Sequence, residues 1–179
     1  MEITVGFAGR EEALIDLFAA TFSDSEGPEE GALVGDLTRD LLAHTPTTDI
    51  DVFCAEDDGA VIGAAVFTPL SFADDPRSVV LLSPMAVTGR RQRRGVGQGL
   101  INHALEALRA RGVDVAITYG DPAYYARVGF QQITEQQARP PLPLSHPHGW
   151  LGRPLSQWDF PNLRGSSTCV SALNRPEIW

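Results

Sequence analysis

A short run of glutamine, arginine and glycine at residues 92–97 has the composition of a phosphate-binding loop. Gly95 and Gly97 have no Cβ, so a phosphate can approach the main chain closely and the backbone can adopt positive φ. The run lies between a predicted strand and a predicted helix. The first backbone amides of a helix have no partner, and the helix dipole favours an anion. These features predict a phosphate or pyrophosphate site.

Basic side chains surround this run. They are Arg90, Arg91, Arg93 and Arg94. Without the glycines, such a cluster would be read as a solvated loop with ion pairs. Next to a strand, two glycines and a helix start, the arginines are instead expected to supplement the backbone amides in binding an anion.

The segment Gln92-Arg93-Arg94-Gly95-Val96-Gly97 resembles the pyrophosphate motif of the GNAT superfamily of acetyl-CoA-dependent N-acetyltransferases. That motif is Gln or Arg, two residues, Gly, one residue, then Gly or Ala, and the segment matches it at every required position. The resemblance implies acetyl-CoA as co-substrate. The cofactor-binding residues it implies in this loop are Gln92, Arg93, Arg94, Gly95, Val96, Gly97 and Gln98.

Residues 82–87 look like the splayed fourth strand of the same family, whose exposed backbone pairs with the pantetheine amides of the cofactor. The resemblance therefore adds Met85, Ala86 and Val87 to the cofactor-binding residues. It also implies that a backbone N–H near Val87 meets the oxyanion. Pro84 gives the splay a local cause, because proline has no N–H for a sheet ladder.

Residues 120–130 resemble the end of the family's conserved core, which often reads Tyr, three residues, Gly-Phe. Tyr125 occupies the tyrosine position, which implies a general acid. A phenol with a reference pKa of about 10 can donate to a thiolate without being ionised at neutral pH. The alternative is that Tyr125 and Tyr124 only pack a short helix against the sheet. Tyr124 is the second choice of donor.

The Gly-Asp-Pro-x-Tyr-Tyr-x-x-x-Gly-Phe version of this segment is similar to a bacterial subgroup of predicted acetyltransferases. The specific resemblance spans residues 79–135. It implies a mixed, twisted sheet of six or seven strands with about four helices, in which the parallel strands four and five splay apart. The length of 179 residues, 43% of them hydrophobic, predicts one domain over residues 1–179.

Hydrophobic spacing and turn residues predict the elements that would position these groups. The expected strands are 3–7, a hairpin of 52–55 and 61–67 around Asp58-Gly59, 79–87, 113–119 and a terminal strand within 167–173. The expected helices include Leu14–Phe18, Leu33–Leu42, one from Gly97 to a stop at Gly112, and one from Asp121-Pro122 to Gly129. Loops are expected at 23–31 and 138–147.

The net charge of −9 argues against non-specific binding to nucleic acid or anionic lipid and suits an amine-bearing acceptor. The sequence shows no export signal and no membrane-spanning run, which favours a cytoplasmic protein. Cys54 and Cys169 are expected to be reduced packing residues. His146 and His148 lack a third nearby ligand, so no metal is predicted.

No residue stands out as the catalytic base. Glu56, Asp121 and His103 are the candidates, but Glu56 is expected in a hairpin turn, Asp121 as a helix cap, and His103 on the helix face away from Leu100 and Ala104. None is therefore favoured, and an amine that arrives neutral or loses its proton through water needs no base. Neither cysteine lies in a Cys-His-acid pattern. Direct transfer in a ternary complex is therefore preferred over an acyl-enzyme.

Three other functions are weighed against N-acetylation. A non-catalytic acyl-CoA sensor or interaction module would bind the cofactor without turnover. A dinucleotide-binding oxidoreductase is disfavoured because Leu100 stands where its fingerprint needs a small residue. A nucleic-acid binder is disfavoured by the acidic charge. The acceptor, the preferred acyl group and a homodimer are left open.

Overall fold

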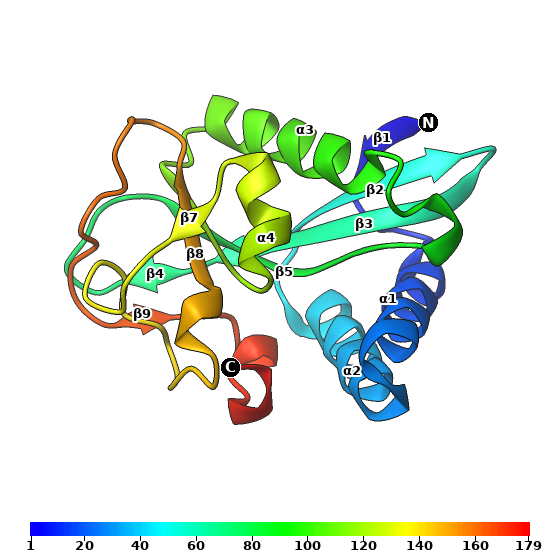
Figure 1. The fold of residues 1–179 in the computed structure, drawn as a ribbon, viewed down its shortest axis with the longest axis horizontal. Coiled ribbons are helices and arrows are strands. Elements are labelled where there is room, and N and C mark those ends of the chain that lie inside the picture. The colour runs from blue at the N-terminus through cyan, green and yellow to red at the C-terminus, as the bar shows by residue number, and fades with distance from the viewer. The chain divides into compact units, whose positions relative to one another are not determined.

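The computed structural model describes residues 1–179, which fold as two compact units (Figure 1). Unit 1 comprises Met1–Phe67 and Pro84–Ala104, and unit 2 comprises Thr68–Ser83 and Leu105–Trp179. The helices are α1 (Glu11–Glu26), α2 (Pro28–His44), α3 (Val96–Ala110) and α4 (Pro122–Tyr125). The strands are β1 (Glu2–Val5), β2 (Asp51–Asp57), β3 (Ala60–Pro69), β4 (Ser71–Phe72), β5 (Val79–Val87), β6 (Val115–Tyr119), β7 (Gln131–Gln132), β8 (Trp150–Pro154) and β9 (Ser167–Thr168).

Seven strands are hydrogen-bonded neighbours in the order β1-β2-β3-β5-β6-β8-β7. The β1–β2 and β2–β3 pairs are antiparallel, β5–β6 is parallel, and β8 is antiparallel to both β6 and β7. With four helices, this mixed seven-stranded sheet confirms the predicted fold class.

The β2–β3 hairpin forms the centre of unit 1. Asp58 and Gly59 both have positive φ, 50° and 77°, which is the backbone of a two-residue turn matched to strand twist. The hairpin buries Val52, Phe53 and Phe67, each about 1% exposed. The predicted hairpin is therefore confirmed, because an Asp-Gly pair accepts the left-handed conformation that the turn needs.

Helices α1 and α2 lie side by side in unit 1 (Figure 1). Gly31 makes this close packing feasible, because a Cβ at that position would lie 2.6 Å from the carbonyl oxygen of Ala19. The predicted loop over 23–31 is wrong. Helix α1 continues to Glu26, only Gly27 with φ of 105° separates the helices, and Pro28 starts α2, where a missing N–H costs nothing.

Unit 2 contains the parallel ladder between β5 and β6. Its registered pairs run from Val79↔Val115 to Leu82↔Thr118. Helix α3 connects the two strands, buries Leu100, Ile101 and other predicted apolar positions, and is followed by Gly112 at φ 92°. The predicted strand–helix–strand order is confirmed.

Helix α4 begins as the sequence predicts. The carboxylate of Asp121 accepts a hydrogen bond from the backbone N–H of Ala123 at 2.9 Å, and Pro122 follows as the first helical residue. Gly129, at φ 80°, ends the following 3₁₀ turn Ala126–Val128. Cap and stop residues thus fix the short segment that carries Tyr125.

The predicted terminal strand over 167–173 is wrong for the main sheet. Only Ser167–Thr168 is a strand, and it pairs with β4 in a separate two-stranded sheet. Residues Ser171–Leu173 form a 3₁₀ turn. The last residue, Trp179, is buried against Tyr119, with ring centroids 6.1 Å apart, and against Trp150 at 5.8 Å. None of the helices combines the length and the apolar character needed to cross a membrane.

A buried carboxylate links the segment after β4 to the segment before β9 within unit 2. The Asp75 side chain is fully buried and accepts hydrogen bonds from the Arg77 backbone N–H, the Arg77 guanidinium and the Arg164 backbone N–H. Burial raises the pKa of Asp75, but these donors outweigh it, so the pKa lies below its usual range. A depressed pKa means that the charged form stabilises the fold.

We predict that Asp75→Asn lowers the free energy of unfolding by about 1–2 kcal/mol at neutral pH, because partly exposed donors of Arg77 and Arg164 lose a charged acceptor. The wild type should lose this stabilisation as pH falls below the unfolded pKa of about 4 toward the lower folded-state pKa of Asp75. Urea unfolding between pH 7 and pH 3 measures both effects. The exposed neighbour provides the control Asp74→Asn, and equal stability of the two variants would contradict the prediction.

Candidate active site and phosphate-binding loop

The backbone of residues 92–97 in unit 1 forms a concavity at the start of α3. Arg93 and Gly95 both have left-handed φ, 59° and 80°. Left-handed residues among right-handed ones turn successive N–H groups toward one point, which is the geometry of an anion-binding nest. The first helical hydrogen bond of α3 runs from the Gly99 N–H to the Gly95 carbonyl, at 2.9 Å. The amides of Val96, Gly97 and Gln98 therefore have no partner within the helix.

Two side-chain contacts fix the approach to this loop. The Gln92 side-chain amide donates to the Val87 carbonyl at 2.9 Å, and Arg91 forms an ion pair with Asp57 of β2. The Gln92 backbone N–H is also directed inward, to the Gly89 carbonyl. Gln92 therefore holds the loop in shape, and the donors for an anion come from the residues after it.

Arg90, Arg93 and Arg94 are exposed and make no ion pair. Unpaired arginines are unusual in a chain with 23 acidic and 14 basic residues, because acidic partners are plentiful. Arg91 differs from them, since Asp57 neutralises it. The loop therefore presents positive charge beside the unpaired amides of α3, which favours a multiply charged anion.

The last residues of β5, Pro84 to Val87, belong to unit 1 and lie beside β3. The Thr88 N–H donates to the Ile62 carbonyl of β3, at 2.9 Å. Because backbone groups alternate along a strand, the N–H and C=O of Val87 point away from β3. Gly63 allows this close pairing, since a Cβ there would lie 3.2 Å from the Ala86 carbonyl. Val87 thus directs an N–H to the edge opposite β3, where an extended ligand can pair.

The parallel ladder of β5 with β6 ends at Leu82↔Thr118, just before Pro84. The prediction that pairing fails locally at this proline is confirmed, because proline supplies no N–H. Among the strand residues predicted to bind the cofactor, Ala86 and Val87 are buried and Met85 is half-buried. Together with residues 92–98, they all lie in unit 1.

Tyr125 lies in unit 2, at the last residue of α4. Its ring contacts Phe130 with centroids 5.5 Å apart, and Tyr124 with centroids 5.2 Å apart at 89°. Gly120 leaves room for the ring, because a Cβ at Gly120 would lie 2.8 Å from Cε2 of Tyr125. Gly120 thus helps to fix the position of the phenol, a role that its place in the Gly-Asp-Pro segment did not predict.

Burial raises the pKa of Tyr125 to about 12, and a side-chain hydrogen bond with Thr118 acts in the opposite direction. The nearby Tyr124 and Asp121 also contribute to the raised pKa. Tyr125 consequently keeps its proton across the physiological pH range. Burial also raises the pKa of Tyr124, the second choice of donor.

Each candidate base has a structural contact. Glu56 accepts a hydrogen bond from Thr4 and pairs with Arg10 at 2.8 Å, and Asp121 caps α4. The His103 ring packs edge-on against Phe53, with centroids 6.4 Å apart. Both cysteines are free thiols, and burial raises their pKa, so neither is an activated nucleophile.

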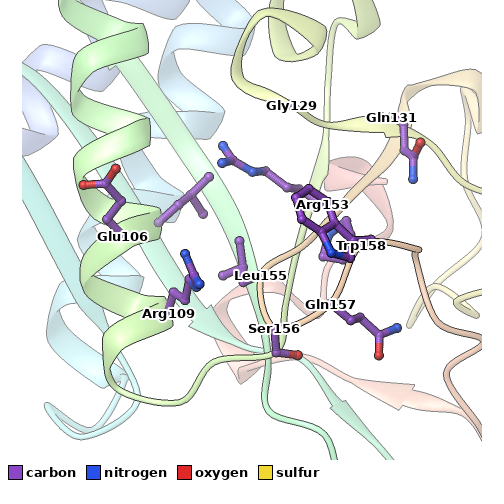
Figure 2. Close-up of a pocket in the computed structure, with 11 residues that line it drawn as sticks. Glu106, Arg109, Gly129, Gln131, Arg153, Leu155, Ser156, Gln157 and Trp158 are labelled. Atoms are coloured by element: carbon purple, nitrogen blue, oxygen red, sulfur yellow. The ribbon is translucent and has the colours of Figure 1, made fainter.

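A cavity of about 550 Å³ lies in unit 2, lined by residues at the end of α3 and in the segment after β8. Figure 2 shows the residues that line it. Arg153 points across it and donates to the Val128 carbonyl at 2.6 Å, at the end of the 3₁₀ turn that follows α4. An arginine on the last carbonyls of a helical segment is an ordinary C-terminal cap. Neither Tyr125 nor Thr118 lines the cavity, so acyl-transfer chemistry is not assigned to it.

The sequence did not predict a role for two residues of this region, Thr118 and Asp57. Thr118 is the only polar side chain among the buried residues of β6, and a hydroxyl at the end of an apolar strand was the available signal. Asp57 was read only as part of a hairpin turn. Its partner Arg91 is far along the chain, so no local pattern reveals the pair.

Comparison with known proteins finds a family match that includes both the loop and Tyr125. Residues 48–132 match the model described as Acetyltransferase (GNAT) domain. The uncharacterized N-acetyltransferase YhbS of Escherichia coli (strain K12) is 29% identical over 114 residues, which is 64% of this chain and 65% of that protein. The match thus spans just under two thirds of this relative's length. The uncharacterized N-acetyltransferase YjhQ from the same strain is 29% identical over 140 residues, 75% of this chain and 77% of the relative.

Solved structures share the fold. The crystal structure of E. coli YhbS in complex with CoA has a TM-score of 0.78 at 24% identity, covering 97% of this chain and 92% of that one. A GNAT family acetyltransferase from Brucella melitensis, in complex with acetyl-CoA, has a TM-score of 0.68 at 23% identity, covering 97% and 99%. These likenesses confirm the GNAT-like fold that the sequence predicts.

The Asp57–Arg91 pair yields a prediction about the loop. We expect Asp57→Asn to increase amide hydrogen exchange at residues 92–98 about threefold to tenfold, because a half-buried ion pair contributes about 1 kcal/mol. Asp58→Asn makes the same charge change one residue away, in a turn where asparagine is well tolerated, and should leave exchange unchanged. Equal exchange in both variants would show that Asp57 does not hold the loop.

Proposed function

We propose that this chain is an acetyl-CoA-dependent N-acetyltransferase of the GNAT superfamily, transferring the acetyl group directly to an amine. The observation that carries the proposal is the nest of unpaired amides and arginines at the start of α3. It lies within the stretch that matches the GNAT model. The names of the relatives and the matched domain support an acyltransferase, and CoA or acetyl-CoA in the solved neighbours supports the co-substrate.

The residues present fit the cofactor by their chemistry. A pyrophosphate needs several N–H donors and positive charge, which Val96, Gly97 and Gln98 amides and the exposed arginines supply. The amides of pantetheine need an open strand edge, which the outward N–H of Val87 supplies, whereas the Val87 C=O is occupied by the Gln92 side chain. We therefore assign Met85 to Val87 and residues 93–98 to cofactor binding, with Gln92 as a support of the loop.

In the proposed reaction, the amine nitrogen forms a bond to the thioester carbonyl carbon, and the carbon–sulfur bond breaks. The carbonyl oxygen gains negative charge, which a backbone N–H at Val87 would stabilise. The amine loses one proton and the departing sulfur gains one, so no net proton is consumed. Tyr125 is the proposed donor to the sulfur.

The raised pKa of Tyr125 shapes this role. A thiol has a reference pKa of about 8.5, so full transfer from a phenol with a pKa of about 12 is uphill. Tyr125 therefore first donates a hydrogen bond to the developing thiolate. The phenol proton then passes to the sulfur as the attacking nitrogen, now a positively charged ammonium group, becomes acidic. A phenol that keeps its proton near neutral pH until the sulfur departs is suited to this task.

Domain organisation and composition extend the proposal. We infer that the two units act as one GNAT-like domain of the bacterial subgroup with a Gly-Asp-Pro-x-Tyr-Tyr segment. Two free cysteines suit a reducing cytoplasm, and a net charge of −9 suits a cationic amine acceptor. The competing function, a sensor that binds acyl-CoA without turnover, would share the loop but would not need Tyr125.

We predict that Gly95→Glu weakens acetyl-CoA binding at least tenfold, because it places a carboxylate in the nest and strains a backbone at φ 80°. Gly89→Glu is the matched control, since Gly89 also faces open space but has no positive φ. Titration of each folded variant with acetyl-CoA measures the difference. Equal affinities would place the cofactor phosphates away from this loop.

We expect Tyr125→Phe to lower kcat about 100-fold while the KM for acetyl-CoA changes less than about threefold, because the donor acts on the leaving group. Release of free thiol from acetyl-CoA, over a panel of diamines, amino acids, aminoglycosides and peptide N-termini, provides the assay. The wild type should show no loss of kcat from phenol ionisation up to about pH 10, below the Tyr125 pKa of about 12. Undiminished kcat in the variant would remove Tyr125 from the mechanism.

A further inference from the structure

A buried hydroxyl lies where the parallel ladder ends. Thr118 of β6 is 1% exposed, and its Oγ1 donates to the Leu82 carbonyl of β5 at 2.9 Å. Leu82↔Thr118 is also the last registered pair of the two strands. This side-chain bond closes the ladder at the point where regular pairing stops.

The same hydroxyl contacts the phenol of Tyr125. The ring is held by Gly120, which has no Cβ to displace it, and by the edge contact with Phe130. In this position, the Tyr125 side chain forms a hydrogen bond with the Thr118 side chain. Three groups thus form a series: the phenol, the threonine hydroxyl and the Leu82 carbonyl.

The direction of these bonds follows from the number of protons. A threonine hydroxyl has one proton and two lone pairs, and a carbonyl can only accept. Because the Thr118 proton is donated to Leu82, the Thr118 oxygen must accept from the Tyr125 O–H. In the resting protein, the phenol O–H is therefore hydrogen-bonded to the Thr118 oxygen.

We propose that Thr118 is a positioning residue for Tyr125. Thr118 accepts the hydrogen bond of the phenol at rest and stabilises the phenol oxygen when the phenol proton moves to the leaving sulfur. The inference rests on the proposed role of Tyr125. As the proton passes to sulfur, the Thr118 hydroxyl turns from Leu82 to the phenolate, and the proton lost by the amine later restores the phenol. The charge-assisted bond to phenolate is stronger than the neutral bond to a carbonyl, which offsets the loss at Leu82.

The direction in which Thr118 shifts the pKa of Tyr125 agrees with this exchange of hydrogen bonds. A hydrogen bond from the Thr118 hydroxyl to the phenol oxygen, which is the arrangement after the exchange, lowers the pKa of Tyr125 against the larger effect of burial, which raises it. A bond that lowers this pKa stabilises the charged phenolate. Thr118 therefore makes a buried phenol a better donor than its surroundings alone would allow.

Fluorine NMR tests this without knowledge of the acceptor. The chain has three tyrosines, so 3-fluorotyrosine labelling gives three resonances, and Tyr125→Phe identifies that of Tyr125. We expect Thr118→Val to change this resonance and to move its titration to higher pH, while Thr118→Ser restores both. Thr118→Ala repeats the test if the valine variant does not fold.

The matched control is Thr38→Val. Thr38 is also fully buried, and its hydroxyl also donates to a backbone carbonyl, that of Val34 at 2.8 Å within α2. We expect this variant to lose stability without changing the Tyr125 resonance. An unchanged Tyr125 resonance and titration in both Thr118→Val and Thr118→Ala would overturn the inference.

Kinetics separate this inference from the proposed function. We expect Thr118→Val to lower kcat about tenfold with Tyr125 present, to leave the KM for acetyl-CoA nearly unchanged, and to have no further effect in Tyr125→Phe. Equal losses in both backgrounds would show that Thr118 acts only on the fold and overturn the inference. A Tyr125→Phe variant with full activity would overturn the role of Tyr125, and the role of Thr118 with it.

Discussion

The early end of the parallel ladder between β5 and β6 is the constraint on which the proposed site depends. Two parallel strands would ordinarily continue to pair, but Pro84 has no N–H to donate, and the register ends at Leu82↔Thr118. The Leu82 carbonyl is then satisfied by a side chain, that of Thr118. Further along β5, the N–H of Val87 faces away from β3 toward a ligand, since pairing with β3 uses the alternate residues, while the Val87 C=O accepts from Gln92.

Charge and burial differ between the loop of unit 1 and Tyr125 of unit 2. In unit 1, Arg93 and Arg94 remain exposed and unpaired in a strongly acidic chain, so they can attract an anion from solution. In unit 2, Tyr125 is half-buried, and burial of its phenol raises its pKa, so its proton is held more tightly than in a free phenol. A loop for binding and a buried donor for chemistry need these different surroundings.

Local signals explain what the sequence predicts well. The Asp58-Gly59 turn, the Asp121 cap and the Gly129 stop depend on the conformations that single residues prefer. The conformations that single residues prefer also explain why the loop of residues 92–97 could be predicted. The error at 23–31 has a local cause too, because Gly27 and Pro28 were read as a loop although a proline also begins a helix readily.

Distant pairings explain what the sequence does not reveal. Ser167–Thr168 pairs with Ser71–Phe72, Asp57 pairs with Arg91, and Thr118 donates to Leu82. Each of these contacts joins residues more than thirty positions apart, and no spacing rule selects one partner among many. The positions of Thr118 and Gly120 beside Tyr125 therefore become visible only in the folded chain.

The most direct test of the account is calorimetric titration of the purified wild-type protein with acetyl-CoA, with NADH as the comparison ligand. The account predicts saturable binding of acetyl-CoA at one site and much weaker binding of NADH, because the loop lacks the third small residue of a dinucleotide fingerprint. Absence of acetyl-CoA binding, or tighter binding of NADH, would contradict the central claim that this loop and strand form an acetyl-CoA site.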